Sequence, residues 1–173
     1  MSDVPVLEAR HLRKRFRGLE AIADLSFTMR RGEMLALIGP NGAGKTTLVS
    51  LISGTLAADG GSLLFEGRAI DHLPPYARAH LGIGRTFQVT KPFPHLTVIE
   101  NVAVGALFGY GGGERNLAAA REQARSLLDF TGLGHRADQQ GDQLGGPDRK
   151  RLELAKALAL KPKLLLLDEV MAG

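Results

Sequence analysis

The chain has 173 residues, a formal net charge of +4, 44% hydrophobic residues and no cysteine. This length suits one domain, and the composition is that of a globular protein with a substantial core, which excludes a largely disordered chain. The lack of cysteine excludes disulfides and thiolate metal sites and fits a reducing compartment. No basic segment followed by an apolar core opens the chain, and its apolar runs are too short to span a bilayer, so we expect a cytoplasmic protein.

The basic residues lie in short, scattered clusters, and aromatic residues make up only 5% of the chain. Proteins that bind single-stranded nucleic acid usually combine a basic groove with stacking aromatic residues. We therefore expect no nucleic-acid partner and interpret the excess of positive charge as a solvated basic surface.

Two strand-like stretches open the chain, Leu7 to Phe16 and Ala23 to Met29, with Gly18 between them. They predict an antiparallel hairpin that leads into the next apolar run. Phe16 is a candidate for stacking on an adenine base, because every base offers a π-face. An aromatic residue at such a position is also often part of the core, and the residue type alone leaves both interpretations open.

A complete G-x-x-x-x-G-K-T phosphate loop follows the hairpin, over Gly39 to Thr46. Its glycines let backbone N–H groups turn toward a polyphosphate, and the N-terminus of the next helix adds partial positive charge. Lys45 is expected to reach the terminal phosphates and Thr46 to ligate Mg²⁺. The expected nucleotide-binding residues of the loop are Gly39, Asn41, Gly42, Ala43, Gly44, Lys45 and Thr46.

The residues on both sides of this loop fit the same interpretation. Met34 to Ile38 predicts a short buried strand, and Leu48, Leu51 and Ile52 recur at the spacing of one helix face, with Gly54 as the expected helix end. A glycine-rich turn that matches the motif by chance would lack both neighbours. The sequence therefore predicts a nucleotide-binding protein that uses ATP and Mg²⁺.

Shorter elements follow. Gly61 to Gly67 predicts a strand, Pro74 and Pro75 open a short helix, and a helical segment begins near Thr97. Glu114 to Phe130 has the pattern of an amphipathic helix. Its apolar side is expected to carry Leu117, Ala120, Ala124, Leu127 and Leu128.

Gln88 ends another strand-like stretch that begins at Ile83. A glutamine at the end of a strand can ligate Mg²⁺ or orient a water molecule. The alternative is an ordinary surface glutamine, since this residue type is mostly exposed.

The last strong signal is an apolar run that ends in two acids. Leu164 to Leu167 predicts a buried strand that ends at Asp168 and Glu169. In a chain with a phosphate loop, an acid at the end of such a strand is the Walker B aspartate that holds Mg²⁺, and Asp168 fits this role. Glu169 is placed to polarise the attacking water as a general base. The alternative is a strand that merely ends in solvated acids.

The order of four features resembles that in the ATPase subunit of an ABC transporter. These features are the phosphate loop, Gln88, a glycine-rich loop before the helix from Arg149 to Leu160, and the acidic strand end. The resemblance covers essentially the whole chain. It implies that Lys45, Thr46 and Thr47 hold phosphates and Mg²⁺, that Phe16 stacks on adenine and that Glu169 is catalytic. It also implies that Gln88 senses the γ-phosphate and contacts the membrane subunit. The stretches most similar to importers of branched-chain amino acids are Leu37 to Asn41, Arg85 to Gln88, Phe93 to Val102 and Arg151 to Leu154.

The resemblance implies an α/β fold with a P-loop core, a mostly parallel sheet, an N-terminal antiparallel β part and a helical subdomain inserted over about residues 92–146. Residues 1–173 then form an incomplete nucleotide-binding domain. The expected function is ATP hydrolysis that powers solute import, at the inner face of the cell membrane. The expected partners are membrane-spanning permease subunits and a second ATPase subunit, in a homodimer or a heterodimer.

The sequence departs from the family at its signature, which reads Leu-Ser-Gly-Gly-Gln in the family and Leu144-Gly145-Gly146-Pro147-Asp148 here. In the family, this segment of one subunit closes over the ATP held by the other. Gly145 lacks the serine hydroxyl, Pro147 has no N–H to donate, and Asp148 would repel a γ-phosphate. We expect the composite site of a homodimer to be weak unless a sister subunit supplies the full signature.

A second departure lies after Glu169. Family members continue through further strands and a histidine that contacts the γ-phosphate, whereas all five histidines here precede Asp168. We expect the centre of the sheet to lack a strand and turnover by the 173-residue chain to be poor. Two alternative functions remain: a nucleotide-binding module without turnover, and a soluble ABC-type ATPase that is not linked to transport.

Overall fold

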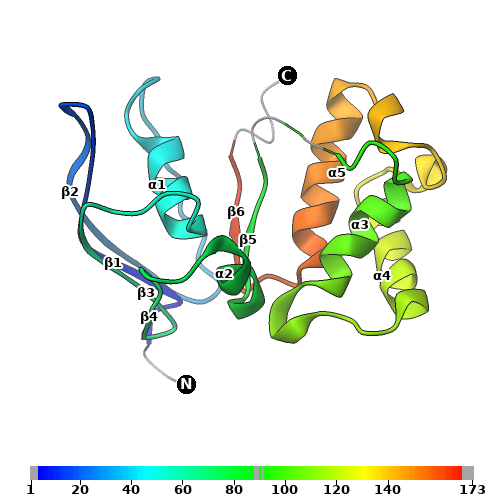
Figure 1. Ribbon diagram of the computed structural model, residues 1–173, viewed down its shortest axis with the longest axis horizontal. Helices are drawn as coiled ribbons and strands as arrows, with labels where there is room; N and C mark the ends of the chain where they lie inside the picture. The colour runs from blue at the N-terminus through cyan, green and yellow to red at the C-terminus, as the bar shows by residue number, and fades with distance from the viewer. Residues whose placement is uncertain (1–3, 88–89, 91, 169–173) are drawn as a thin grey trace. The chain divides into compact units, whose positions relative to one another are not determined.

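The computed structural model describes residues 4–87, 90 and 92–168 (Figure 1). The chain divides into two compact units, residues 1–78 and residues 79–173. Each unit has its own hydrogen-bonded framework and is described by itself.

The first unit is built on a four-stranded sheet in the order β2-β1-β3-β4, with antiparallel neighbours throughout (Figure 1). The predicted hairpin is confirmed, since Leu7 lies opposite Met29 and Phe16 opposite Leu19. The second strand begins four residues before the predicted Ala23, because a tight turn with positive φ at Arg17 (42°) and Gly18 (93°) lets pairing continue to the end of the first strand. The strands are β1 (Leu7–Phe16), β2 (Leu19–Met29), β3 (Gly60–Phe65) and β4 (Arg68–Ala69).

The helix after the phosphate loop is confirmed as α1 (Lys45–Ser53), and it ends at Gly54 with φ of 80°. Its predicted apolar face is buried. The buried Arg78 closes the C-terminal end of this helix, because its guanidinium donates to the carbonyls of Leu51 and Ile52 at 2.7 and 3.0 Å. The Leu51 carbonyl also accepts the backbone N–H of the C-cap residue Gly54 at 3.3 Å, so the arginine adds to the hydrogen bonds at a helix end where i→i+4 donors are lacking.

The predicted buried strand over Met34 to Ile38 is wrong. The backbone of this stretch is irregular, and Met34 and Ile38 are 95% and 94% exposed. A strand needs a hydrogen-bonded neighbour, and within the described part of the chain no strand pairs with these residues. An apolar run without a partner strand supplies neither burial nor a ladder, whatever its composition.

The second unit contains a short parallel pair, β5 (Ile83–Arg85) and β6 (Leu164–Leu166), which follows α2 (Pro75–Leu81) in the chain. Ile83 lies opposite Leu164 and Arg85 opposite Leu166. The predicted strand at residues 164–167 is therefore confirmed except for Leu167, which is exposed. Because the two strands run in the same direction, their carboxyl ends lie at one edge.

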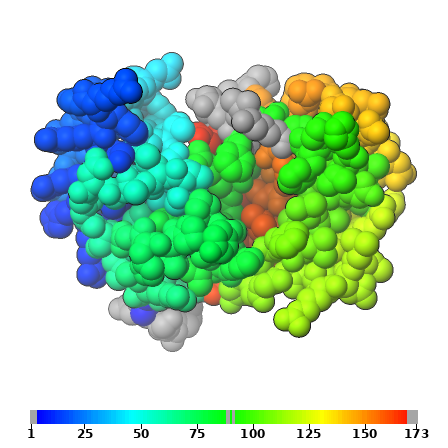
Figure 2. Space-filling model, viewed as in Figure 1, coloured from blue at the N-terminus to red at the C-terminus, as the bar shows by residue number. Residues whose placement is uncertain are grey.

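Three helices pack around one apolar cluster in the same unit, and their atoms form a continuous mass in Figure 2. The cluster includes Val98, Val102, Ala124, Leu128 and Leu152. The helices are α3 (Val98–Leu107), α4 (Leu117–Phe130) and α5 (Gly146–Ala159), with short 3₁₀ turns η1 (Tyr110–Gly112), η2 (Gly134–Arg136) and η3 (Gly141–Gln143) between them.

The amphipathic helix over residues 114–130 begins later than predicted. The Asn116 side chain accepts hydrogen bonds from the backbone N–H groups of Ala118 and Ala119 and so starts α4 at Leu117. Leu117 itself is exposed, so its assignment to the apolar face is wrong; a residue in the first turn lies at the rim of the packed surface. Ala120, Ala124 and Leu128 are buried as predicted.

Candidate nucleotide-binding site

The phosphate loop takes its shape from glycines. Gly42 and Gly44 have φ of 84° and 82°, values that side chains other than glycine rarely adopt. At Gly44 a Cβ atom would lie 2.5 Å from the carbonyl oxygen of Ala21, so only glycine fits against β2. The loop therefore passes close to β2 and is followed directly by the first turn of α1.

The first turn of α1 suits an anion. Its N-cap residue, Gly44, offers no side chain to the backbone N–H groups, and the turn contains no acidic residue. The N–H groups of a first helical turn have no intrahelical acceptor, and together with the helix dipole they attract negative charge. The exposed Thr46 places an oxygen donor at the same turn.

Lys45, the first residue of α1, bends back over the loop. Its ammonium donates to the carbonyl oxygens of Gly39 and Pro40 at 2.6 and 2.8 Å. A lysine held by neutral carbonyls above a set of N–H donors can exchange these acceptors for the charged oxygens of a polyphosphate, which form stronger hydrogen bonds.

Phe16 lies at the tip of the hairpin and is 43% exposed, which is the exposure of a surface aromatic rather than a core residue. The Lys14 ammonium lies 5.6 Å from its ring centroid and also pairs with Asp59 at 2.7 Å. The hydrogen bond from Lys14 lowers the pKa of the Asp59 carboxyl below its usual range. The sequence analysis did not predict the contact between Lys14 and Phe16. Residues two apart in a strand lie on the same side of it, so the spacing of these two residues could have indicated the contact.

In the second unit, Asp168 follows β6 and its side chain is only 8% exposed. A guanidinium nitrogen of Arg85, Nη2, lies 3.4 Å from its Oδ2. The backbone N–H of Asp168 donates to the Thr86 hydroxyl at 3.2 Å. The interpretation that the strand ends in solvated acids is therefore wrong for Asp168, which is buried and paired.

Gln88 and Glu169 lie outside the described residues, so their predicted roles stay predictions. Within the described ranges, no group of three or more His, Cys, Asp or Glu side chains could hold a metal ion. Thr46 and Asp168 have the oxygen donors that Mg²⁺ prefers.

The altered signature lies at the start of α5, with Gly145 as N-cap and Pro147 in the first turn. Asp148 pairs with Arg136 at 3.0 Å and with Arg151 at 3.4 Å. Two guanidinium groups thus reduce the negative charge that the sequence predicted for this turn, although Pro147 still lacks an N–H. This helix start differs from that of α1, where no acidic residue is present.

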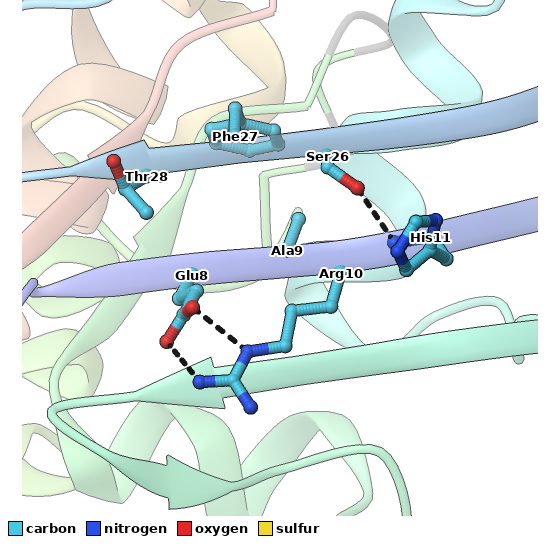
Figure 3. A pocket seen from close by; sticks show the side chains of 7 residues that line it. All are labelled: Glu8, Ala9, Arg10, His11, Ser26, Phe27 and Thr28. Atoms are coloured by element: carbon cyan, nitrogen blue, oxygen red, sulfur yellow. Dashed lines mark hydrogen bonds and ion pairs between the residues drawn. The ribbon is translucent and has the colours of Figure 1, made fainter.

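A separate hollow of about 370 Å³ lies on the antiparallel sheet (Figure 3). Figure 3 shows Glu8 bonded to Arg10 and the backbone N–H of His11 bonded to the Ser26 hydroxyl. None of its lining residues belongs to the phosphate loop. Its two oppositely charged side chains, Glu8 and Arg10, pair with each other.

The family model described as ABC transporter matches residues 22–172. The chain belongs to the ABC transporter family. Its fold is accordingly that of an ABC ATPase cassette, an α/β P-loop fold, as the sequence predicted. The expectation of a mostly parallel sheet is wrong for the described strands, of which only β5 and β6 pair in parallel. Among the described residues, no helix is long and apolar enough to cross a membrane.

Relatives within the ABC transporter family include the probable branched-chain amino acid transport ATP-binding protein LivG of Archaeoglobus fulgidus, 37% identical over 97% of this chain and 68% of that protein. The lipopolysaccharide export system ATP-binding protein LptB of Escherichia coli is also 37% identical, over 96% of this chain and 68% of its own length. A solved dimer of the ATP-binding cassette MJ0796, bound to ADP and Pi, superposes with a TM-score of 0.86 at 25% identity, over 95% of this chain and 74% of that one. The chain is thus an ABC-type ATPase, a class of nucleotide-binding proteins that serves transporters.

For this ABC ATPase, exchanging Phe16 for alanine is expected to weaken the binding of ATP about tenfold, because stacking of a base on an aromatic ring contributes about 1–3 kcal/mol. Binding of inorganic tripolyphosphate, which has no base, should stay within about twofold of the parent. Calorimetric titration of both ligands checks this, with Phe130→Ala, an exchange of another exposed phenylalanine, as the control. An equal loss for both ligands would show that Phe16 supports the fold rather than the base.

Proposed function

We propose that this chain is the ATP-binding subunit of an ABC importer and powers uptake of a solute by Mg²⁺-dependent ATP hydrolysis. The observation that carries the proposal is the geometry of the phosphate loop: two glycines with positive φ, an acid-free helix start and a lysine folded across the loop. Phosphoryl transfer to water needs positioned donors and neutralising charge more than covalent chemistry, and this loop supplies both.

In this proposal the loop residues 39–47 hold the phosphates and Lys45 neutralises the terminal ones. Thr46, Gln88 and Asp168 hold Mg²⁺, and Glu169 acts as the general base toward the attacking water. Mg²⁺ supplies Lewis-acid stabilisation of the phosphoryl oxygens. Phe16 stacks on adenine.

The proposed assembly places this subunit at the inner face of the cell membrane, docked on permease subunits, with Gln88 at the contact. Support for a transport role comes from the relatives, which are named as ATP-binding proteins of transport systems. A branched-chain amino acid is the solute we propose, supported by the likeness to LivG and by the stretches from Arg85 to Gln88 and from Phe93 to Val102.

We further propose that the functional ATPase is a heterodimer. The signature at the start of α5 lacks the serine hydroxyl and one N–H group. In a homodimer, the signature of each copy would therefore donate fewer hydrogen bonds to the ATP that the other copy binds. A sister subunit with Leu-Ser-Gly-Gly-Gln would complete the site formed by this chain's phosphate loop. The dimeric structure of MJ0796 bound to ADP and Pi supports a paired arrangement.

A comparison of homodimer and mixed dimer tests the proposal. We expect hydrolysis by a mixed dimer with an intact sister subunit to exceed that of this chain alone by at least about tenfold, since the donors lost from the signature are worth about 1.5–3 kcal/mol toward a charged group. The triple exchange Gly145→Ser, Pro147→Gly and Asp148→Gln should raise hydrolysis of the homodimer in the same direction.

Three other outcomes bear on the alternatives. No turnover in any pairing, with nucleotide binding retained, would favour a binding module without catalysis. Equal hydrolysis by the homodimer and the mixed dimer would contradict the heterodimer. Co-purification with a permease, rather than with ribosomes or DNA, distinguishes a transport subunit from an ATPase with another role.

A further inference from the structure

The acid at the end of β6 has a basic partner at the end of β5. Arg85 and Asp168 have side chains that are only 11% and 8% exposed, and Nη2 lies 3.4 Å from Oδ2. Shielding from water strengthens an interaction between opposite charges. The carboxylate that we assign to Mg²⁺ therefore already has a guanidinium as its neighbour.

The backbone of Asp168 is held in place by a different residue. Thr86 donates its own N–H to the carbonyl of Leu166 at 3.0 Å, and its hydroxyl accepts the N–H of Asp168 at 3.2 Å. Because these bonds involve neither the carboxylate nor the guanidinium, removal of the Arg85 charge leaves the end of β6 anchored. Arg85 thus affects the charge next to the Asp168 carboxylate and not the backbone conformation at the end of β6.

The same guanidinium also faces an aromatic ring. Its central carbon lies 5.3 Å from the ring centroid of Phe87, a distance at which a cation is attracted by the π-face. Phe87 directly precedes Gln88 in the sequence. One cation therefore links the acid of the metal site to the segment that carries Gln88.

We propose that Arg85 is a positioning residue that serves as the counter-ion of Asp168 when no metal is bound and gives up this carboxylate when Mg²⁺ arrives. The divalent cation repels the guanidinium and competes for the same oxygen, so metal binding shifts Arg85 away from Asp168 and changes its contact with Phe87. Occupancy of the metal site is thereby transmitted to the segment before Gln88. This inference rests on the proposed Mg²⁺-dependent function.

The first test is the Mg²⁺ dependence of nucleotide binding, measured with a fluorescent ADP analogue at a series of Mg²⁺ concentrations. The Arg85→Met variant keeps the apolar stem of the side chain but lacks the competing charge. We expect the Mg²⁺ concentration that gives half of the full change in nucleotide affinity to be about five- to tenfold lower than in the parent. Arg85→Lys keeps the charge and should stay near the parent. Arg121→Met, which removes an exposed arginine paired with Glu100 on the helices, is the matched control and should not change the Mg²⁺ dependence.

The second test uses a fluorescent reporter at the ring. The chain contains no tryptophan, so Phe87→Trp introduces a single indole beside Arg85. With nucleotide present, addition of Mg²⁺ should change the emission of this indole, and the change should disappear in the double variant Phe87→Trp, Arg85→Met. Circular dichroism of each variant confirms that it is folded.

The outcomes separate this inference from the function on which it rests. If the parent binds the analogue with the same affinity at every Mg²⁺ concentration, the inference is overturned, and if its ATP hydrolysis is also independent of Mg²⁺, the proposed function falls as well. If the parent depends on Mg²⁺ and Arg85→Met has the same dependence, only the role of Arg85 is overturned. An unchanged indole response in the double variant overturns it as well.

Discussion

Replacing Lys45 with alanine is expected to reduce the affinity for ATP and ADP about a hundredfold, because hydrogen bonds to charged groups are worth about 1.5–3 kcal/mol and 1.4 kcal/mol is tenfold in affinity. The ammonium donates to the carbonyls of Gly39 and Pro40, so it is held above the loop rather than in open solvent. Its loss removes the one positive side chain of the G-x-x-x-x-G-K-T motif.

Calorimetric titration with each nucleotide measures this effect. Lys150→Ala removes the same charge from α5, outside the loop, and should bind within about twofold of the parent. Lys45→Arg is a useful second variant: a planar guanidinium does not replace a compact ammonium at a site shaped for it, so we expect only partial recovery. Equal binding by Lys45→Ala and the parent would refute the assignment of the phosphate loop.

Replacing Arg78 with methionine is expected to lower the free energy of unfolding of the first unit by about 3 kcal/mol or more, because it removes four hydrogen bonds that a buried cation donates to backbone carbonyls. Its guanidinium donates to Leu51 and Ile52 at the end of α1, and to Asp71 and Leu73 in the preceding loop at 3.1 and 2.9 Å. Burial lowers the pKa of Arg78, yet a guanidinium stays charged at neutral pH, so all four bonds come from a cation.

Urea unfolding followed by circular dichroism measures the loss. Arg68→Met, an exposed arginine on β4, is the matched control and should change stability by less than about 0.5 kcal/mol. Since α1 begins in the phosphate loop, partial loosening of this helix should also weaken nucleotide binding in Arg78→Met. A variant as stable as Arg68→Met would show that the hydrogen bonds from Arg78 do not stabilise the first unit.

Local patterns predicted much of the fold. The hairpin of β1 and β2, the helix α1 with its end at Gly54, and the apolar side of α4 at Ala120, Ala124 and Leu128 follow from periodicity and turn chemistry. These elements are stabilised by residues close in sequence, so a short window of the chain contains their physical causes. The phosphate loop was predictable for the same reason, since its donors are contiguous.

The sequence alone determined that this chain carries a phosphate loop and an acidic strand end, and the order of these motifs identified its family. Only the tertiary structure decided the environments of the individual side chains. It exposed Met34 and Ile38, buried Asp168 beside Arg85, and placed Arg78 on the carbonyls of α1. Each of these outcomes depends on a partner far away in the chain: a strand needs a neighbouring strand, a buried charge needs a counter-ion, and a helix end needs donors that the helix itself cannot provide.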